Sequence, residues 1–211
     1  MGTFNHHLFT TFPVVGILRG FSHELTVEIA GVAADSGLAC LEVTMNSPGA
    51  CASIRAILED CGDRMNVGAG TVCSLDDLDR ALAAGAQFVV SPITDTEMIR
   101  RCVALSVPVF PGAMTPTEIH QAWTAGATMV KVFPAGTLGP KHIKGVKAPL
   151  DGVKLLPTGG VSLENAHEFL QAGADGLGVG SPLFDEKRML ARDWNWLREQ
   201  IAGFRALFAQ T

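Results

Sequence analysis

The chain has 211 residues, 47% of them hydrophobic and 18% charged, and its formal net charge is −5. Because the charge is negative and no stripe of Lys and Arg is present, nucleic acid is not a predicted partner. No apolar run reaches the roughly 18 residues that a transmembrane helix needs, so no membrane span is expected. The opening MGTFNHHLFTTF lacks the basic and then apolar segments of a signal peptide.

The cysteines indicate a reducing compartment. There are five, an odd number, and none forms a CxxC pair. This usage is typical of reduced thiols in a cytoplasmic protein, where most of them are expected to be small core residues.

One pattern recurs along the chain: a helical stretch, a glycine, and then a short apolar run, as in ALAAGAQFVVSP (81–92) and FLQAGADGLGVGS (169–181). Glycine ends a helix well because it accepts the left-handed conformation, and the β-branched run after it favours a strand. The predicted strands, in chain order, are 14–19, 40–46, 66–72, 87–92, 107–113, 128–134, 153–158 and 176–180. A helix is expected after each strand, and several of these helices have predicted N-caps at Ser22, Ser47, Ser74, Thr115 and Ser162.

The strands are nearly continuous apolar runs, which is typical of a parallel sheet covered by helices. Eight strand–helix units predict an α/β fold, a single (β/α)8 TIM barrel that occupies residues 1–211 as one domain. The segment of about 1–12 is expected to add a helix that closes the bottom of the barrel, and the last helix is expected at about 188–208. The competing fold is a doubly wound open sheet, but no GxGxxG follows the first strand.

Lys131 lies in the middle of the apolar stretch TMVKVFPAG, residues 128–136. Alternate side chains of a barrel strand point inward, so Met129, Lys131 and Phe133 are predicted to face the interior. Apolar surroundings disfavour a charged amine and lower its pKa, which makes a lysine nucleophilic. The structural alternatives are a lysine that snorkels to the surface or a buried ion pair with Glu42.

Three further strands bring polar side chains to the same interior. Glu42 shares the inward face of its strand, and Arg19 and Thr71 stand at the carboxyl ends of theirs. Catalytic residues of a barrel gather at these ends. Each residue also has a structural explanation: Glu42 as a partner of Lys131, Arg19 as a rim charge, and Thr71 as an ordinary strand residue.

Two glycine-rich strand ends, PTGGVS (157–162) and GVGSPLF (178–184), predict a phosphate site. Exposed backbone N–H groups after the seventh and eighth strands of this fold commonly bind phosphate. The alternative is that Gly159, Gly160 and Gly180 only permit tight turns.

Across roughly residues 14–184 the chain resembles the class I aldolases that cleave 2-keto-3-deoxy-6-phosphosugar acids. The matching motifs, in order, are LEVTMN, VGAGTV, SP at 91–92, PGAMTPTE, KVFPA, PTGGVS and GVGS. The resemblance implies that Lys131 forms the Schiff base and that Glu42 transfers protons. It also implies a trimer, a phosphorylated keto acid as substrate, and no cofactor.

Further roles come from the same resemblance. Thr71 matches a residue lining the pyruvyl site, and Phe133 matches the aromatic packed by the lysine. The phosphate-binding positions match Gly160, Gly180 and Ser181, with Gly159 beside them.

The resemblance also separates two branches of the family. Asn46 in EVTMN stands where the phosphogluconate branch has an arginine, whereas Arg19 in ILRG and the NSP at 46–48 look like the phosphogalactonate branch. The carboxylate anchor is therefore expected at Arg19, and the galactonate acid is the favoured substrate, with the gluconate acid or dual specificity as the alternative. More distant alternatives are a phosphosugar isomerase or epimerase and a phosphosugar-binding protein without activity. No metal site is expected, because no spaced His, Cys and Asp cluster is present.

Overall fold

The computed structural model describes residues 3–209, in which helices and strands alternate as the sequence predicts. The strands are Val14–Leu18 (β1), Cys40–Thr44 (β2), Asn66–Gly70 (β3), Val89–Val90 (β4), Val109–Phe110 (β5), Gly112–Ala113 (β6), Val130–Val132 (β7), Leu155–Pro157 (β8) and Leu177–Val179 (β9). The helices are His6–Thr11 (α1), His23–Asp35 (α2), Ala50–Cys61 (α3), Leu75–Ala83 (α4), Thr96–Ala104 (α5), Pro116–Thr124 (α6), Ala135–Lys147 (α7), Leu163–Gln171 (α8), Glu186–Leu190 (α9) and Trp194–Ala206 (α10).

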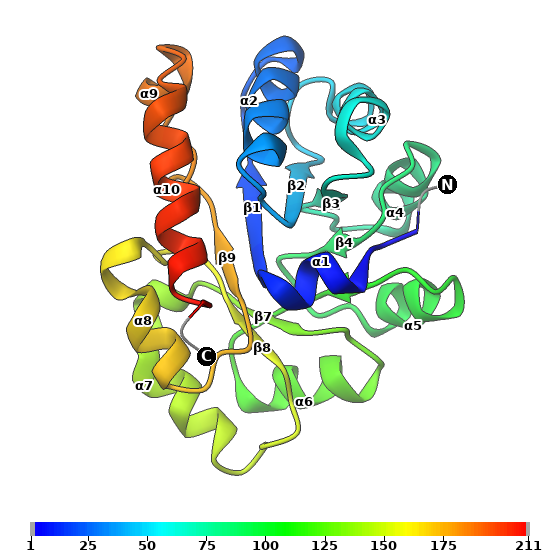
Figure 1. Ribbon diagram of the computed structural model, residues 1–211. Helices are drawn as coiled ribbons and strands as arrows, with labels where there is room; N and C mark the ends of the chain where they lie inside the picture. The colour runs from blue at the N-terminus through cyan, green and yellow to red at the C-terminus, as the bar shows by residue number, and fades with distance from the viewer. Residues whose placement is uncertain (1–2, 210–211) are drawn as a thin grey trace.

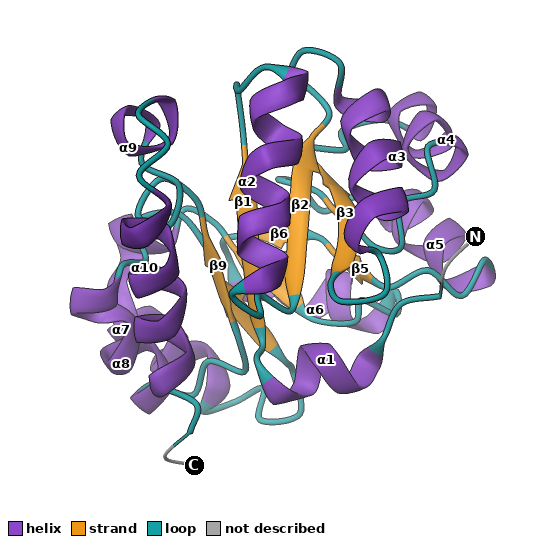
Figure 2. Ribbon diagram, turned by 45° about the horizontal axis from the view of Figure 1, so that its top comes forward, coloured by secondary structure: helices purple, strands orange, loops and turns teal. Residues whose placement is uncertain are grey.

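The strands form a curled, entirely parallel arrangement with helices on its outside (Figure 1; Figure 2). One sheet has the order β5-β4-β3-β2-β1-β9, and a second has the order β6-β7-β8. Pro111 alone separates β5 from β6, and a bridge connects Thr158, the residue after β8, with Gly178 in the middle of β9. Because β1 to β5 lie side by side in chain order, the sheet lacks the reversal of order that defines a doubly wound fold.

Each predicted strand contains an observed one, although the observed strands are shorter. The predicted strand 107–113 is divided at Pro111, whose nitrogen has no hydrogen to donate to a ladder. The predicted last helix, 188–208, is two helices: α9 ends at Leu190, and Asp193 caps the start of α10 through the amide of Trp196.

Three of the five predicted N-caps, those of α2, α4 and α6, accept a hydrogen bond from a backbone amide at the start of the helix. A fourth, Ser162, stands at the N-cap of α8, where its own amide donates to Asn165 Oδ1 at 2.9 Å. The prediction that Ser47 caps a helix was wrong. Helix α3 begins at Ala50 and has Gly49 at its N-cap, so the Ser47 hydroxyl is left for other partners.

Helix α1 covers the end of the sheet at which the strands begin (Figure 1; Figure 2). Its Phe9 packs edge-on against Phe110, and the preceding Phe4 packs against Phe88. The chain before α1 is held by Asn66, the first residue of β3, which exchanges two hydrogen bonds with the backbone of Asn5. The expected N-terminal helix is thus present and leaves the opposite, carboxyl end of the strands open.

The buried hydrophobic residues form one continuous cluster that includes α1 and α10. None of the five cysteines forms a disulfide, and Cys40, Cys61 and Cys102 are buried in this core. Among residues 3–209, no helix has both the length and the apolar character that crossing a bilayer requires.

Candidate active site

A cavity of about 460 Å³ lies at the carboxyl ends of the strands. Seven of the nine predicted site residues line it: Arg19, Lys131, Phe133, Gly159, Gly160, Gly180 and Ser181. Of the other two, Glu42 is buried close to Lys131, and Thr71 reaches the site through Arg19.

Lys131 is the central residue of β7 and is only 3% exposed. Its Nζ atom lies 5.2 Å from the centroid of the Phe133 ring. Burial lowers the pKa of Lys131, and although the charge of Glu42 opposes this shift, the charge of Arg19 adds to it. A lysine in these surroundings has a larger neutral fraction at neutral pH than an exposed one.

Glu42 lies in the middle of β2 and is 1% exposed. Neither of its carboxylate oxygens has a hydrogen-bond partner among the described residues, so the hydrogen-bonded ion pair with Lys131 that the sequence left open is not formed. Burial raises the pKa of Glu42, while Lys131 and Arg19 act in the opposite direction. A side chain at Gly70 would overlap the carboxyl group, which explains a glycine at this point of β3.

The unpaired carboxyl group of Glu42 is typical of a functional site. A buried polar group without a partner costs free energy, and such groups concentrate at functional sites. The pKa of Glu42 is raised and the pKa of Lys131 is lowered, so both shifts are in the direction of neutral pH. Shifts in these directions favour proton exchange by both groups.

Arg19 follows β1, and its Nη2 atom donates a hydrogen bond of 3.3 Å to Thr71 Oγ1. Thr71 follows β3 and has a φ of 55°, a left-handed conformation that is rare for a β-branched residue. Strained backbone of this kind clusters at functional sites. Arg19 therefore brings a cation to the cavity wall, and the Thr71 hydroxyl is hydrogen-bonded to it.

Two glycines in the cavity wall have the backbone conformation that a tight turn requires. Gly159 and Gly160 have φ of 81° and 79°, and a Cβ at Gly160 would lie 2.9 Å from the Cα of Gly136. They therefore do permit a tight turn. The same turn, just before α8, lines the cavity together with Gly180 and Ser181.

Sequence reasoning missed several residues that line the cavity: Ile17, Gly20, Phe21, Thr158, Val161, Pro182, Phe184 and Glu186. Ile17 could have been found, because it shares the parity of Arg19 on the first strand. Glu186 carries no such signal, since it reaches the cavity from the first turn of α9.

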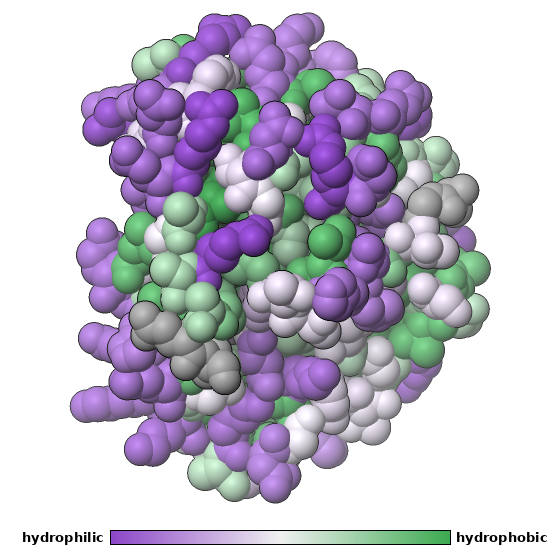
Figure 3. All heavy atoms as spheres, viewed as in Figure 1, coloured by the Kyte–Doolittle hydropathy of each residue, from purple (hydrophilic) through white to green (hydrophobic). Residues whose placement is uncertain are grey.

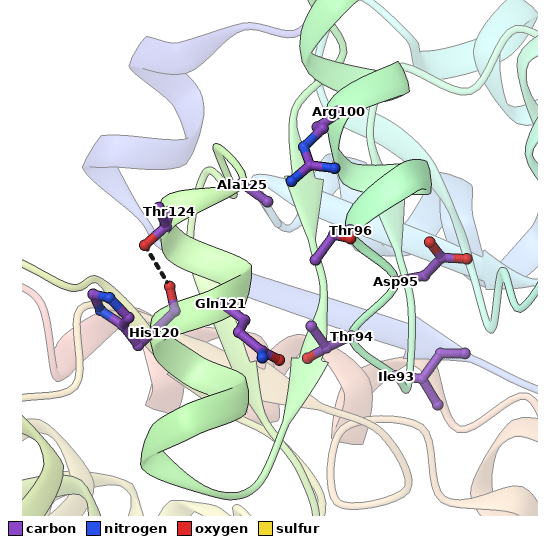
Figure 4. Close-up of a pocket in the computed structure, with 9 residues that line it drawn as sticks. All are labelled: Ile93, Thr94, Asp95, Thr96, Arg100, His120, Gln121, Thr124 and Ala125. Carbon is purple, nitrogen blue, oxygen red and sulfur yellow. Dashed lines mark hydrogen bonds between the residues drawn. The ribbon is translucent and has the colours of Figure 1, made fainter.

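A second hollow, of about 740 Å³, lies between α5 and α6. Figure 4 shows Thr96 and Arg100 of α5 on one side and His120, Gln121 and Thr124 of α6 on the other. It is a shallower surface groove and contains neither a buried lysine nor a buried carboxylate among its lining residues. Within residues 3–209 no group of three or more His, Cys, Asp or Glu side chains is placed to hold a metal ion.

The family model for KDPG and KHG aldolase matches residues 6–199. The chain belongs to the KDPG and KHG aldolase family. It is 38% identical over 196 residues to the 2-dehydro-3-deoxy-6-phosphogalactonate aldolase of Escherichia coli K12, covering 92% of this chain and 94% of that protein.

Solved structures of this aldolase family agree with the fold. A native KDPGal structure superposes with a TM-score of 0.87 at 34% identity, covering 94% of this chain and 95% of that one. The KDPG aldolase of Legionella pneumophila, solved with pyruvate captured as a covalent carbinolamine, superposes with a TM-score of 0.83 at 26% identity, covering 92% of this chain and 94% of that one.

Proposed function

We propose that this aldolase cleaves 2-dehydro-3-deoxy-6-phosphogalactonate to pyruvate and D-glyceraldehyde 3-phosphate through a Schiff base at Lys131. One observation carries the proposal. A buried lysine with a lowered pKa lines a cavity whose wall also contains an arginine and glycine-rich backbone turns. A substrate with a carboxylate, a keto group and a phosphate fits this set of groups.

The first step is imine formation. The neutral amine of Lys131 attacks C2 of the keto acid, and loss of water from the carbinolamine leaves a protonated imine. The pyruvate that was captured as a covalent carbinolamine in the Legionella relative supports this step. The protonated imine is an electron sink, so the electron pair of the C3–C4 bond can move toward it when that bond breaks.

Glu42 moves the protons. Its carboxylate, directly or through a water molecule, accepts the proton of the C4 hydroxyl as the bond breaks, which releases the aldehyde and leaves an enamine. The same group then returns the proton to C3, and water hydrolyses the resulting imine to pyruvate. The raised pKa and the two unpaired oxygens of Glu42 suit a group that alternates between these forms.

The two anionic ends of the substrate fix its position. Arg19 and Thr71 hold the C1 carboxylate, and Gly159, Gly160, Gly180 and Ser181 hold the phosphate. Phe133 packs beside the Lys131 amine. Anchoring both ends places C3–C4 next to the lysine, which is where positioning contributes most to the rate.

The choice of substrate rests on sequence similarity to relatives named for the galactonate acid. Arg19 at the end of β1 and Asn46 after β2 support the same branch. The gluconate acid, the substrate in the name of the Legionella relative, is the second candidate.

We also propose that the two sheets close into one (β/α)8 barrel that makes residues 1–211 a single domain. Backbone hydrogen bonds on both sides of the sheet junctions support closure: Lys131 N donates to Pro111 O, and Asp175 N donates to Leu155 O. The single core cluster supports one domain.

A homotrimer is the proposed assembly, with the face around α5 and α6 as its contact surface. Ile93, Val103, Leu105 and Met114 are large hydrophobic residues exposed on or beside this face. In Figure 3, hydrophobic residues reach the surface at the right of the view, where α5 lies. Exposed apolar side chains that gather on one face are typical of a protein interface.

The proposal is tested by trapping the imine. The protein is incubated with pyruvate and borohydride, digested, and searched for the reduced adduct by mass spectrometry. An adduct on Lys131 is expected. No adduct, or one on Lys141, Lys144 or Lys147, contradicts the proposal. Turnover of the galactonate and gluconate acids by the same preparation then decides the substrate, and binding without turnover would identify a binding protein.

A further inference from the structure

Hydrogen bonds tie the turn that carries Arg19 and Gly20 to the turn that follows β2. The amide of Gly20 donates to Ser47 Oγ at 2.9 Å. Ser47 Oγ in turn lies 2.8 Å from Thr44 Oγ1, and either hydroxyl can be the donor. The two turns are joined through a serine that the proposed mechanism does not use.

Ser47 is held firmly in this place. It and Thr44 are both buried, and the amide of Ser47 donates to Thr44 O at 2.9 Å. The turn is fixed to β3 in addition, since Met45 N donates to Gly70 O at 2.8 Å. Ser47 therefore offers Gly20 an acceptor whose position is set by two neighbouring strands.

Gly20 needs such a partner. Its φ is 80°, and nothing lies within 4 Å of a Cβ built there, so the glycine is present for its backbone conformation and not for lack of space. Glycine has more conformational freedom than other residues, and a turn around it is ordered only where contacts hold it. Arg19 stands between the end of β1 and this glycine, so a movement of Gly20 re-aims Arg19.

We propose that Ser47 is a positioning residue that fixes the direction of Arg19 toward the substrate carboxylate. This inference rests on the proposed function, in which Arg19 binds that carboxylate. Arg19 is then held at two points: its backbone through Gly20 and Ser47, and its side chain through Thr71. A preorganised cation binds a carboxylate with a smaller loss of conformational entropy.

Ser47→Ala is the direct test. The variant leaves the Gly20 amide without its acceptor, and the half-saturating pyruvate concentration in borohydride trapping is expected to rise about tenfold, the effect of losing one such hydrogen bond. KM for the phosphorylated substrate is expected to rise more than kcat falls, because the lysine and the glutamate are untouched. Ser47→Thr, which keeps the hydroxyl, is expected to restore most of the loss.

Ser53→Ala is the matched control. Ser53 is a buried serine of α3 whose hydroxyl bonds Gly49 O and His23 Nδ1. Its loss is expected to lower the melting temperature about as much as Ser47→Ala does while pyruvate dependence stays at the wild-type value. An equal loss of pyruvate binding in both variants would mean that Ser47 only supports the fold, and would overturn the inference.

Combination with Arg19→Ala separates positioning from other effects. If Ser47 acts through Arg19, then Ser47→Ala has little further effect on pyruvate binding once Arg19 is alanine. Full additivity overturns the inference.

Should Ser47→Ala fail to fold, Thr44→Val keeps the side-chain volume and removes the second hydroxyl. It is expected to weaken pyruvate binding in the same direction, and an unchanged value overturns the inference.

The wild-type protein separates this inference from the function on which it rests. Absence of a wild-type pyruvate adduct at Lys131 overturns both. A wild-type adduct together with unchanged pyruvate dependence in Ser47→Ala overturns the role of Ser47 alone.

Discussion

Arg19 donates a hydrogen bond to Thr71 across 52 positions of the sequence, from the end of β1 to the end of β3. The pair joins a flexible cation to a hydroxyl whose backbone is strained. Arg19 also lines the cavity that contains Lys131, as the proposed carboxylate anchor requires.

Arg19→Ala is predicted to weaken binding at this carboxylate end. A charge-assisted hydrogen bond to a carboxylate contributes roughly 1.5–3 kcal/mol, so kcat/KM should fall about 10–150-fold. The loss should also appear in trapping with pyruvate alone, which has the carboxylate but no phosphate. Lower thermal stability with normal pyruvate binding would instead mark Arg19 as a rim charge of the fold.

Ser181→Ala is predicted to show the opposite pattern at the phosphate end. The phosphorylated substrate should bind more weakly, because one hydroxyl donor is lost, while pyruvate trapping stays near the wild-type value. Steady-state kinetics and trapping on the same preparation make the comparison. Equal losses with both ligands would remove Ser181 from the phosphate site.

Glu42→Gln is predicted to separate imine formation from proton transfer. Glutamine keeps the size of the side chain but cannot exchange the proton, so cleavage should fall by about 10²–10⁴-fold, the usual contribution of general acid–base catalysis. The pyruvate adduct at Lys131 should still form. Turnover near the wild-type rate would leave Glu42 with a structural role only.

The same variant is predicted to be more stable than the wild type at pH 8. Burial raises the folded-state pKa of Glu42 above its usual value of 4.5 and leaves both oxygens unpaired, so folding disfavours the ionised form. The resulting loss of stability is absent below pH 4.5 and grows as pH rises through the folded-state pKa. Thermal melts of both proteins between pH 4.5 and pH 8 should show the advantage of Glu42→Gln shrinking as pH falls; a constant difference contradicts the assignment.

Dialysis against EDTA is predicted to leave aldol cleavage unchanged. The protonated imine at Lys131 supplies the electron sink that a metal ion supplies in other aldolases, so the proposed steps need no Lewis acid. The assay is cleavage before dialysis, after dialysis and after divalent metal is returned. Loss that metal restores would place the protein in a different mechanistic class.

Ile93→Lys combined with Met114→Lys is predicted to dissociate the trimer, because lysine ammonium groups would be buried at the proposed contact face. Light scattering after gel filtration gives the molar mass. The control is Leu190→Lys, which places the same charge on an exposed leucine of α9 outside that face. A trimer that survives the double substitution would exclude this face as the interface.

The sequence determined the elements of this protein and the faces of its strands. Side chains alternate along a strand with a period of two, so the inward direction of Lys131 and Glu42 followed from their apolar neighbours alone. Helix ends followed from local chemistry as well, since a cap needs only a hydroxyl and an amide a few residues away. The turn at Gly159 and Gly160 was visible because glycine is the residue that tolerates its left-handed backbone.

Only the tertiary structure decided which of these local features meet. Ser47 had the local signature of a helix cap, yet its hydroxyl bonds Gly20 from another turn, because the packing of β1 against β2 brings the two turns together. Glu186 enters the cavity by the same kind of long-range placement. The directions of the pKa shifts at Lys131 and Glu42 belong here too, since desolvation depends on everything that packs around a group and on no single stretch of chain.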